Sequence, residues 1–179
     1  MSGQFLFEHV LYVNWMTPAS SPTSRTKGRR FDSAEQEAYL NLWRTYDRLR
    51  LIEDELFDRH ELTAQQYNAL RLLRAAHPRR VPTLHLAGRL VSRAPDITRL
   101  LDKLVERGLV VRERLADNRR VVHVGITEAG LLLLDQLADE VRSCHERQLG
   151  HMAAEVMTQL VELLRKARGP HEGEGSSWH

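Results

Sequence analysis

Arginine dominates the residues of this 179-residue chain that could do chemistry. It accounts for 23 of the 26 basic residues, and its guanidinium group binds phosphate or the edge of guanine through paired hydrogen bonds. Residues 79–120 contain 11 basic and 5 acidic residues, a net charge of +6, whereas the rest of the chain carries −4. Such a basic segment is typical of a nucleic-acid-binding surface. A genome of high GC content would also favour arginine, so composition alone does not decide between the two.

Cysteine and histidine form no recognisable metal or catalytic motif. Cys144 is the only cysteine, which excludes an internal disulfide or a cysteine-based zinc site and favours a reducing compartment, the cytoplasm. His145 and His151 have no acidic or cysteine partner at ligand spacing, so we expect no metal site. Neighbouring residues on a helix do not face each other, which argues against a Cys144–His145 nucleophile. The sequence has no phosphate loop or dinucleotide fingerprint. We expect neither an enzyme nor a cofactor.

Helices make up most of the framework expected around the basic segment. Apolar residues recur at three- and four-residue steps from residue 32 to 59, which predicts a long helix. Thr63 and Gln66 form a capping box that opens a second helix. His77 and Pro78 end that helix, because a residue before proline disfavours the helical conformation.

Four more helices are expected further along the chain. A short one covers residues 84–90. The next begins at an N-cap, Ser92, and ends at Gly108, which supplies a left-handed C-terminal cap. Two longer helices follow at about residues 127–149 and 153–167.

Residues 109–114 and 120–126 interrupt the helical pattern. They are rich in β-branched residues and partly alternate in polarity, and Ala116, Asp117 and Asn118 between them signal a turn. Two short helices followed at once by a basic hairpin are typical of a winged helix-turn-helix. The predicted fold is therefore mainly α with a small β-hairpin wing.

The helix after Ser92 has the two faces that a recognition helix needs. Its apolar stripe would pack on the neighbouring helices and consists of Ile97, Leu100, Leu101 and Leu104. The residues that would enter a major groove about 12 Å wide are Arg93, Pro95, Asp96, Thr98, Arg99 and Lys103. Arg93 or Arg99 would bind guanine, and Asp96 would accept a hydrogen bond from cytosine. The helix dipole explains a first-turn carboxylate equally well, so the role of Asp96 stays open.

Three segments, residues 62–70, 86–90 and 92–110, resemble the MarR family of bacterial transcription regulators. The wing is the sharpest match. It contains the family's Asp-x-Arg and Thr-x-x-Gly patterns, at Asp117 and Arg119 and at Thr127 and Gly130. The resemblance covers roughly residues 33–168, nearly the whole body of the chain.

The resemblance implies a single domain at residues 32–168 that forms an obligate homodimer. Residues 62–126 would be the winged helix-turn-helix, and residues 32–60 and 127–168 the dimerisation helices. Such a dimer binds a near-palindromic operator, with half-sites about 10 base pairs apart. The terminal helices carry more apolar surface than one small winged domain can cover, which agrees with a dimer. An intramolecular helical bundle is the alternative.

The resemblance also assigns roles to the wing. Arg119 at its tip would enter the minor groove, whose negative potential attracts arginine. Asp117 would hold the turn by pairing with an arginine. Arg112, Arg114 and Arg120 would contact phosphates, which position the protein without reading the sequence.

Members of the family commonly respond to small anionic ligands, often aromatic or phenolic, that bind between the dimer helices and the winged module. The candidates here are Trp43, Tyr46, Tyr67 and His85. Core packing is the alternative for each, since aromatic residues at helical spacing more often belong to a core. Cys144 is expected to be a small buried hydrophobe, with a thiol switch as the alternative.

The two ends of the chain differ from the body. Residues 1–31 combine an apolar cluster with a stretch rich in Pro, Ser, Thr and Arg. They are expected to be a disordered tail, an arm that packs on the body or on a second subunit, or an extension ahead of a start at Met16. Residues 169–179 should be flexible. No apolar run approaches the roughly 20 residues of a membrane helix.

We therefore expect a DNA-binding transcription regulator, a repressor that a small ligand releases from its operator. One alternative is a winged-helix regulator without a small-molecule effector. Another is a winged-helix module that binds protein. That module would have a neutral recognition helix and wing, and the basic residues of segment 79–120 argue against it.

Overall fold

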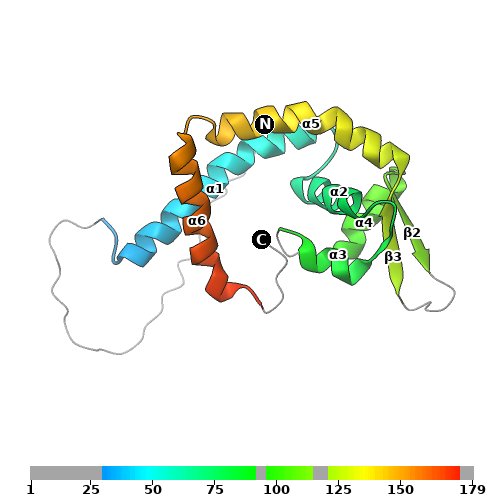
Figure 1. Ribbon diagram of the computed structural model, residues 1–179, viewed down its shortest axis with the longest axis horizontal. Helices are drawn as coiled ribbons and strands as arrows, with labels where there is room; N and C mark the ends of the chain where they lie inside the picture. Colours follow the sequence, from blue (N-terminus) through cyan, green and yellow to red (C-terminus); the bar gives the residue numbers. More distant parts are fainter. Residues whose placement is uncertain (1–29, 92–95, 115–120, 174–179) are drawn as a thin grey trace, which may run out of the picture. The chain divides into compact units, whose positions relative to one another are not determined.

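The structure is a computed structural model that describes residues 30–91, 96–114 and 121–173 (Figure 1). The chain divides into two compact units, residues 1–40 and 41–179. The described part of the first unit contains the beginning of α1 (Ala34–Asp58). There the hydroxyl of Ser33 accepts a hydrogen bond from the amide of Gln36 at 3.1 Å, as an N-cap does.

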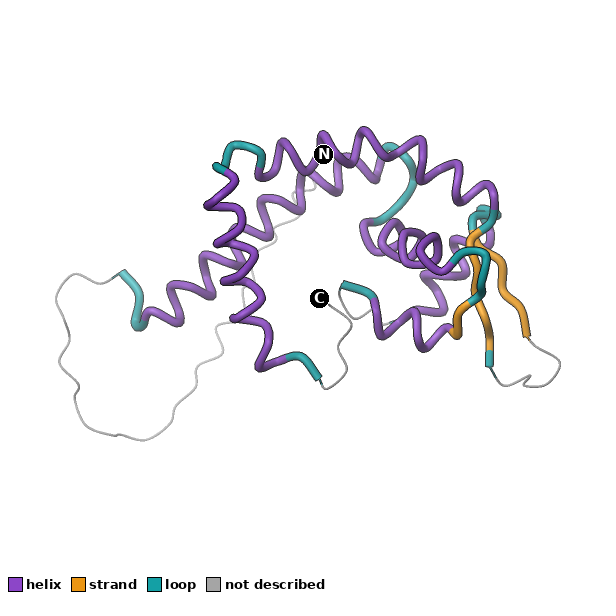
Figure 2. Tube along the Cα trace, viewed as in Figure 1, coloured by secondary structure: helices purple, strands orange, loops and turns teal. Residues whose placement is uncertain are grey.

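A winged helix-turn-helix lies within the second unit. Its helices are α2 (Ala64–Ala76), α3 (Thr83–Arg89) and α4 (Ile97–Glu106). Its antiparallel sheet has the order β1-β3-β2 and consists of β1 (Val81–Pro82), β2 (Val110–Arg114) and β3 (Val122–Ile126). The described strands all belong to this sheet, and the other described residues form helices, loops and turns (Figure 2). The predicted fold class and hairpin are confirmed.

The local signals at α2 act as the sequence predicts. The Thr63 hydroxyl accepts from the amide of Gln66 at 3.2 Å, and the Gln66 side chain accepts from the amide of Thr63 at 2.9 Å. This capping box satisfies two amides that would otherwise lack partners in the first turn. Gln66 is the only buried polar residue among the described ones. The box therefore joins the start of α2 to the core.

The start of α4 differs from the prediction. Asp96, not Ser92, is the N-cap, and its carboxylate accepts from the amide of Arg99 at 2.9 Å. Aspartate is among the strongest N-cap residues, and Asp96 stands directly before the apolar stripe. Ser92 lies outside the described residues. At the other end Gly108 adopts φ 68°, which confirms the predicted left-handed cap.

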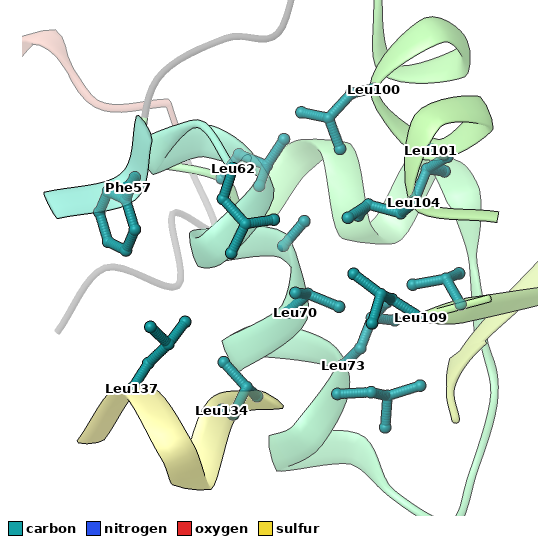
Figure 3. Close-up of a cluster of buried hydrophobic side chains, with 14 of the residues drawn as sticks. Phe57, Leu62, Leu70, Leu73, Leu100, Leu101, Leu104, Leu109, Leu134 and Leu137 are labelled. Atoms are coloured by element: carbon teal, nitrogen blue, oxygen red, sulfur yellow. The ribbon is translucent and has the colours of Figure 1, made fainter. Parts of the chain in front are cut away.

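Leucine fills the core of the winged module (Figure 3). Leu70, Leu73, Leu101 and Leu104 have at most 1% of their surface exposed. Each such burial stabilises the fold by roughly 1.5–3 kcal/mol. Phe57 from α1 and two residues of α5 (Glu128–Leu149), Leu134 and Leu137, complete the cluster. The core therefore extends from the winged module to the C-terminal end of α1 and along α5 as far as Cys144.

The second half of α1 runs antiparallel to α5. The Gln148 side chain donates to the carbonyl of Leu49 at 2.9 Å, and the Cys144 thiol lies 3.8 Å from the carbonyl of Ile52. Nearer the end of α1, Arg147 pairs with Glu55 at 3.3 Å. Cys144 is buried, as the sequence predicts.

The outermost helices leave apolar side chains uncovered. No residue of α6 (Ala154–Arg168) is buried. Its Val156, Val161 and Leu163 are exposed, as are Leu42 and Trp43 of α1. None of the described helices is long and apolar enough to cross a membrane.

Candidate nucleic-acid interface

Helix α4 presents a buried apolar side and an exposed polar side. Leu100, Leu101 and Leu104 face the core. Thr98, Arg99 and Lys103 are exposed together with Asp96. Neither Arg99 nor Lys103 forms an ion pair with another described residue. Two cationic groups are therefore available to a ligand on one side of the helix.

The Asp96 carboxylate has a structural partner, because it caps α4. One of its oxygens accepts from the amide of Arg99. This contact supports the alternative that the sequence left open, in which a first-turn carboxylate stabilises the helix. A role in reading cytosine is thus not needed to explain the residue.

Arg112 on β2 connects the wing with the recognition helix. Its guanidinium group pairs with the Asp102 carboxylate and donates to the carbonyl of Thr98 at 2.8 Å. Only 27% of its side chain is exposed, against 49% for Asp102. The sequence predicted a phosphate contact for Arg112. These internal partners connect β2 with α4, and the phosphate contact stays a prediction.

A second arginine spans the sheet. Arg80 precedes β1, crosses Gly125 of the central strand β3 and forms an ion pair with Glu113 of β2. The two outer strands are thereby connected through one side chain. Sequence analysis did not single out Arg80 or Glu113, because their pairing depends on the strand order β1-β3-β2.

The face between α3, α4 and the wing is hollowed. A depression of about 670 Å³ lies there. Thr98, Arg112 and Arg114 line it, together with Thr83, whose hydroxyl donates to the carbonyl of Val122 at 3.0 Å. Arg114 is exposed and forms no ion pair with a described residue. The other predicted DNA contacts, Arg93, Pro95, Asp117, Arg119 and Arg120, lie outside the described residues.

A separate cavity of about 560 Å³ lies between α1, α2, α5 and the end of α3. Two of the predicted ligand-binding residues, Tyr46 and Tyr67, line it, whereas Trp43 and His85 are not among its lining residues. Trp43 is 60% exposed on α1, and His85 is exposed on α3. Tyr67 is held in place by Phe57, with ring centroids 4.7 Å apart.

Charged side chains that the sequence did not single out also line this cavity. They are Arg50, Glu53, Asp54 and Arg71, and the imidazole of His145 lines the cavity as well. Arg50 pairs with Asp54 at 2.9 Å. Burial raises the pKa of the Glu53 carboxyl, and the nearby His145 partly opposes that shift. Burial likewise raises the pKa of Tyr67, against the effect of Arg71 and Arg74. These groups come from three helices, so no local motif could have predicted them.

The cavity reaches the segment that precedes the recognition helix. Leu90 and Val91, which follow α3, line it together with Asn68 of α2. The Asn68 side-chain oxygen accepts from the amide of Val91 at 3.2 Å. A molecule in the cavity would therefore contact both sides of a hydrogen bond that holds the helix-turn-helix.

Comparison of this chain with known proteins identifies the protein family to which it belongs. The model described as the MarR family matches residues 62–122. The MarR transcription factor from Planctomyces limnophilus is 59% identical, with 76% of this chain and 98% of that chain covered and a TM-score of 0.61. This chain belongs to the MarR family. Its members are transcription regulators and not enzymes, and the chain is thus a DNA-binding regulator.

Two more distant MarR-like structures share the fold. Sco3205 from Streptomyces coelicolor, solved in complex with DNA, is 18% identical and has a TM-score of 0.72. The match covers 85% of this chain and 97% of the Sco3205 chain. BpsR from Bordetella bronchiseptica, whose DNA binding is regulated by 6-hydroxynicotinic acid, is 21% identical and has a TM-score of 0.67. The match covers 73% of this chain and 98% of the BpsR chain.

In this MarR-family protein, the end of the recognition helix is joined to the junction of α1 and α2. Arg107 donates to the carbonyls of Glu61 and His60 at 2.6 and 3.1 Å. The same junction contacts α5, because Glu140 accepts from Arg59 at 2.9 Å and lies 3.1 Å from His60. These hydrogen bonds hold the pKa of the Glu140 carboxyl below its usual value. The junction therefore contacts both the recognition helix and a long outer helix.

Proposed function

We propose that this MarR-family regulator is a repressor that binds a near-palindromic operator as a homodimer and releases it when a small aromatic anion binds. The exposed cationic side of α4 carries the proposal. Arg99 and Lys103 are exposed there without ion-pair partners among the described residues. Arg112 holds β2 against that helix.

DNA binding would use both the recognition helix and the wing. Arg93, Arg99 and Thr98 would reach base edges in the major groove, with Pro95 and Asp96 at the start of the helix. Lys103, Arg114 and Arg120 would contact phosphates. Arg119 would enter the minor groove, with Asp117 holding the turn. Sco3205, which shares the fold, has been solved with DNA.

The uncovered apolar side chains of the outer helices support a homodimer. Nothing in α6 is buried, although Val156, Val161 and Leu163 are large apolar residues. Leu42 and Trp43 of α1 are similarly exposed. Exposed apolar surface of this kind marks an interface. A two-fold dimer would place the two recognition helices in major grooves about 10 base pairs apart.

The cavity beside the helix-turn-helix supports release by a ligand. It has the volume of a small-molecule site and is lined by Tyr46, Tyr67 and the pair Asn68 and Val91. A ligand that competes for the Asn68 side chain would free the amide of Val91, which lies five residues before Asp96, the N-cap of α4. The MarR-like protein BpsR is regulated by an aromatic acid.

Fluorescence anisotropy with duplex DNA from the upstream region of the regulator's own gene tests the proposal. We expect sequence-selective binding at one dimer per site, and a loss of about 10³–10⁵ in affinity between about 50 and 200 mM salt. Salicylate-like acids should release the DNA. Arg99→Ala should weaken binding by roughly 1–3 kcal/mol, or about fivefold to a hundredfold. Arg142→Ala is the matched control, because Arg142 pairs with Asp139 on α5, away from α4.

The outcomes separate the alternatives. Selective binding that no tested acid disturbs would favour a regulator without a small-molecule effector. Binding that is insensitive to salt would contradict the phosphate contacts and favour a protein partner.

A further inference from the structure

Two opposite charges line the cavity without a partner. Arg71 of α2 and Glu53 of α1 both line it, yet neither forms an ion pair or a side-chain hydrogen bond within the part of the chain that the structure describes. By contrast, Arg50 and Asp54 in the same wall neutralise each other at 2.9 Å. The cavity therefore has one neutralised pair, an exposed arginine and a half-buried carboxyl group, and the last two have no ion-pair partner among the described residues.

Glu53 is the less usual of the two groups, because it is half-buried. Burial raises the pKa of its carboxyl, and the nearby His145 only partly opposes that shift, as expected for a carboxylate that has lost water and accepts no hydrogen bond from a described side chain. A half-buried acceptor of this kind favours a ligand that donates a hydrogen bond to it. A plain aromatic acid would bring a second anion into the cavity and leave Glu53 unsatisfied.

Two tyrosines are among the other lining residues, and one of them, Tyr46, is 61% exposed. Tyr46 and Tyr67 both line the cavity, and Tyr67 is fixed against the Phe57 ring. Arg71 and Glu53 act on the Tyr67 hydroxyl with opposite sign, so both charges lie near that side chain. The cavity thus combines an aromatic surface, a cation and an acceptor.

We propose that the effector is a flat aromatic or heteroaromatic acid that also carries an N–H donor. Arg71 binds its carboxylate and Glu53 accepts from its N–H group. This inference rests on the proposed function, since it assigns the chemical class of the ligand to the same cavity.

Two matched pairs of compounds test the donor. Indole-2-carboxylate and benzofuran-2-carboxylate differ only in a ring N–H or ring oxygen beside the acid. Indole-5-carboxylate and benzofuran-5-carboxylate differ in the same way, with the acid at the other ring. Calorimetric titration of the full chain without DNA should show at least one indole acid bound about tenfold more tightly than its benzofuran partner, as expected for a hydrogen bond to a charged acceptor.

Substitutions at Glu53 and Arg71 test the role that each side chain has in binding the ligand. Glu53→Met should remove the preference for the indole acid, and Glu53→Gln should reduce it. Arg71→Met should weaken both members of a pair equally. Arg74→Met is the matched control on α2, because Arg74 pairs with Asp135 and does not line the cavity. Thermal melting of each variant checks that it is folded.

Each result decides the inference. Equal binding within both pairs, no binding of any of the four acids, or a preference that survives in folded Glu53→Met would overturn it. Release of DNA by the same four acids is measured separately by fluorescence anisotropy. Preferential binding of an indole acid that leaves the protein on DNA would contradict ligand-controlled release but keep the assignment of Glu53. Release by all four acids with equal potency would support ligand-controlled release but contradict the assignment of Glu53.

Discussion

The winged module and the outermost helix differ in how they satisfy their apolar residues. In the module, Leu101 and Leu104 are fully buried, and side chains such as Arg112 connect its elements. In α6, no residue is buried, although the helix has a clear apolar face. The module is therefore stabilised by its own core, whereas the apolar side chains of α6 stay uncovered within the described residues. In the proposed dimer, the module would contact DNA and α6 would help to set the distance between two such modules.

The largest expected effect lies in the core of the module. Leu101→Ala removes a side chain with 0% exposure and should lower the free energy of unfolding by about 2–5 kcal/mol. Chemical denaturation measures this change. Leu132→Ala is the control, because Leu132 is 61% exposed on α5, and it should change stability by less than about 0.5 kcal/mol. Equal effects would remove the distinction between a self-sufficient core and an uncovered surface.

The next effect concerns the outer helix. The double substitution Val156→Lys and Leu163→Lys places charges on its exposed apolar face and should weaken dimerisation at least a hundredfold, or about 2.7 kcal/mol. Analytical ultracentrifugation measures the dimer, and circular dichroism should show retained helices. Gln159→Lys with Glu162→Lys, at exposed polar positions of α6, should leave the dimer intact. A double variant at the apolar positions that remains dimeric would place the interface elsewhere.

Within the module, two arginines of β2 have different surroundings. Arg112 contacts Asp102 and Thr98, whereas Arg114 is exposed without an ion-pair partner among the described residues. Arg112→Ala should weaken DNA binding roughly tenfold to a hundredfold through loss of its contacts with Asp102 and Thr98, with little change in salt dependence. Arg114→Ala should have a smaller effect on affinity but reduce the log–log salt slope by about 0.9 per protomer. Titrations at several salt concentrations measure both. If Arg112→Ala reduces the slope as much, Arg112 contacts phosphate.

The smallest expected effect is at Cys144. Burial raises the pKa of its thiol, and the reactive species is the thiolate. Because the thiol is also buried, Ellman's reagent at pH 8 should label the native protein about a hundredfold more slowly than the urea-unfolded chain. Peroxide should leave DNA binding unchanged, in the wild type as in Cys144→Ser. Loss of binding in the wild type alone would revive the thiol switch.

Local signals in the sequence predicted most of the fold. The capping box of Thr63 and Gln66 and the left-handed Gly108 lie where expected, since their geometry depends on neighbours within a few residues. The predicted start of α4 was wrong because the sequence offers two strong N-cap residues, Ser92 and Asp96, only four positions apart, and Asp96 is the N-cap. The two-residue strand β1 has too few residues for a periodic pattern, and its pairing with β3 is long-range.

The sites were harder to predict, because side chains distant in the sequence build them. Asp102, the partner of Arg112, has the spacing of any exposed helical residue, and only the fold brings the two together. The cavity combines Glu53, Arg71 and His145 from three helices. Aromatic type alone identified Tyr46 and Tyr67 as candidates but did not distinguish them from Trp43, which is exposed on the same helix and does not line the cavity.

The corner between the wing and α5 has a mechanical consequence. Thr127, the N-cap of α5, accepts from the amide of Gly130 at 3.1 Å and donates to the carbonyl of Gly108 at 2.7 Å. A methyl group added at Gly130 would lie 2.5 Å from the carbonyl oxygen of Leu109, so the start of α5 packs closely against the backbone that precedes β2 and leaves no room for a side chain. A helix of 22 residues is about 33 Å long, and a tilt of 5° about this corner moves its far end by about 3 Å. In the proposed dimer, α5 would act as a stiff lever, and a small change of angle at Thr127 would shift its far end by about the 3.4 Å of one base-pair step.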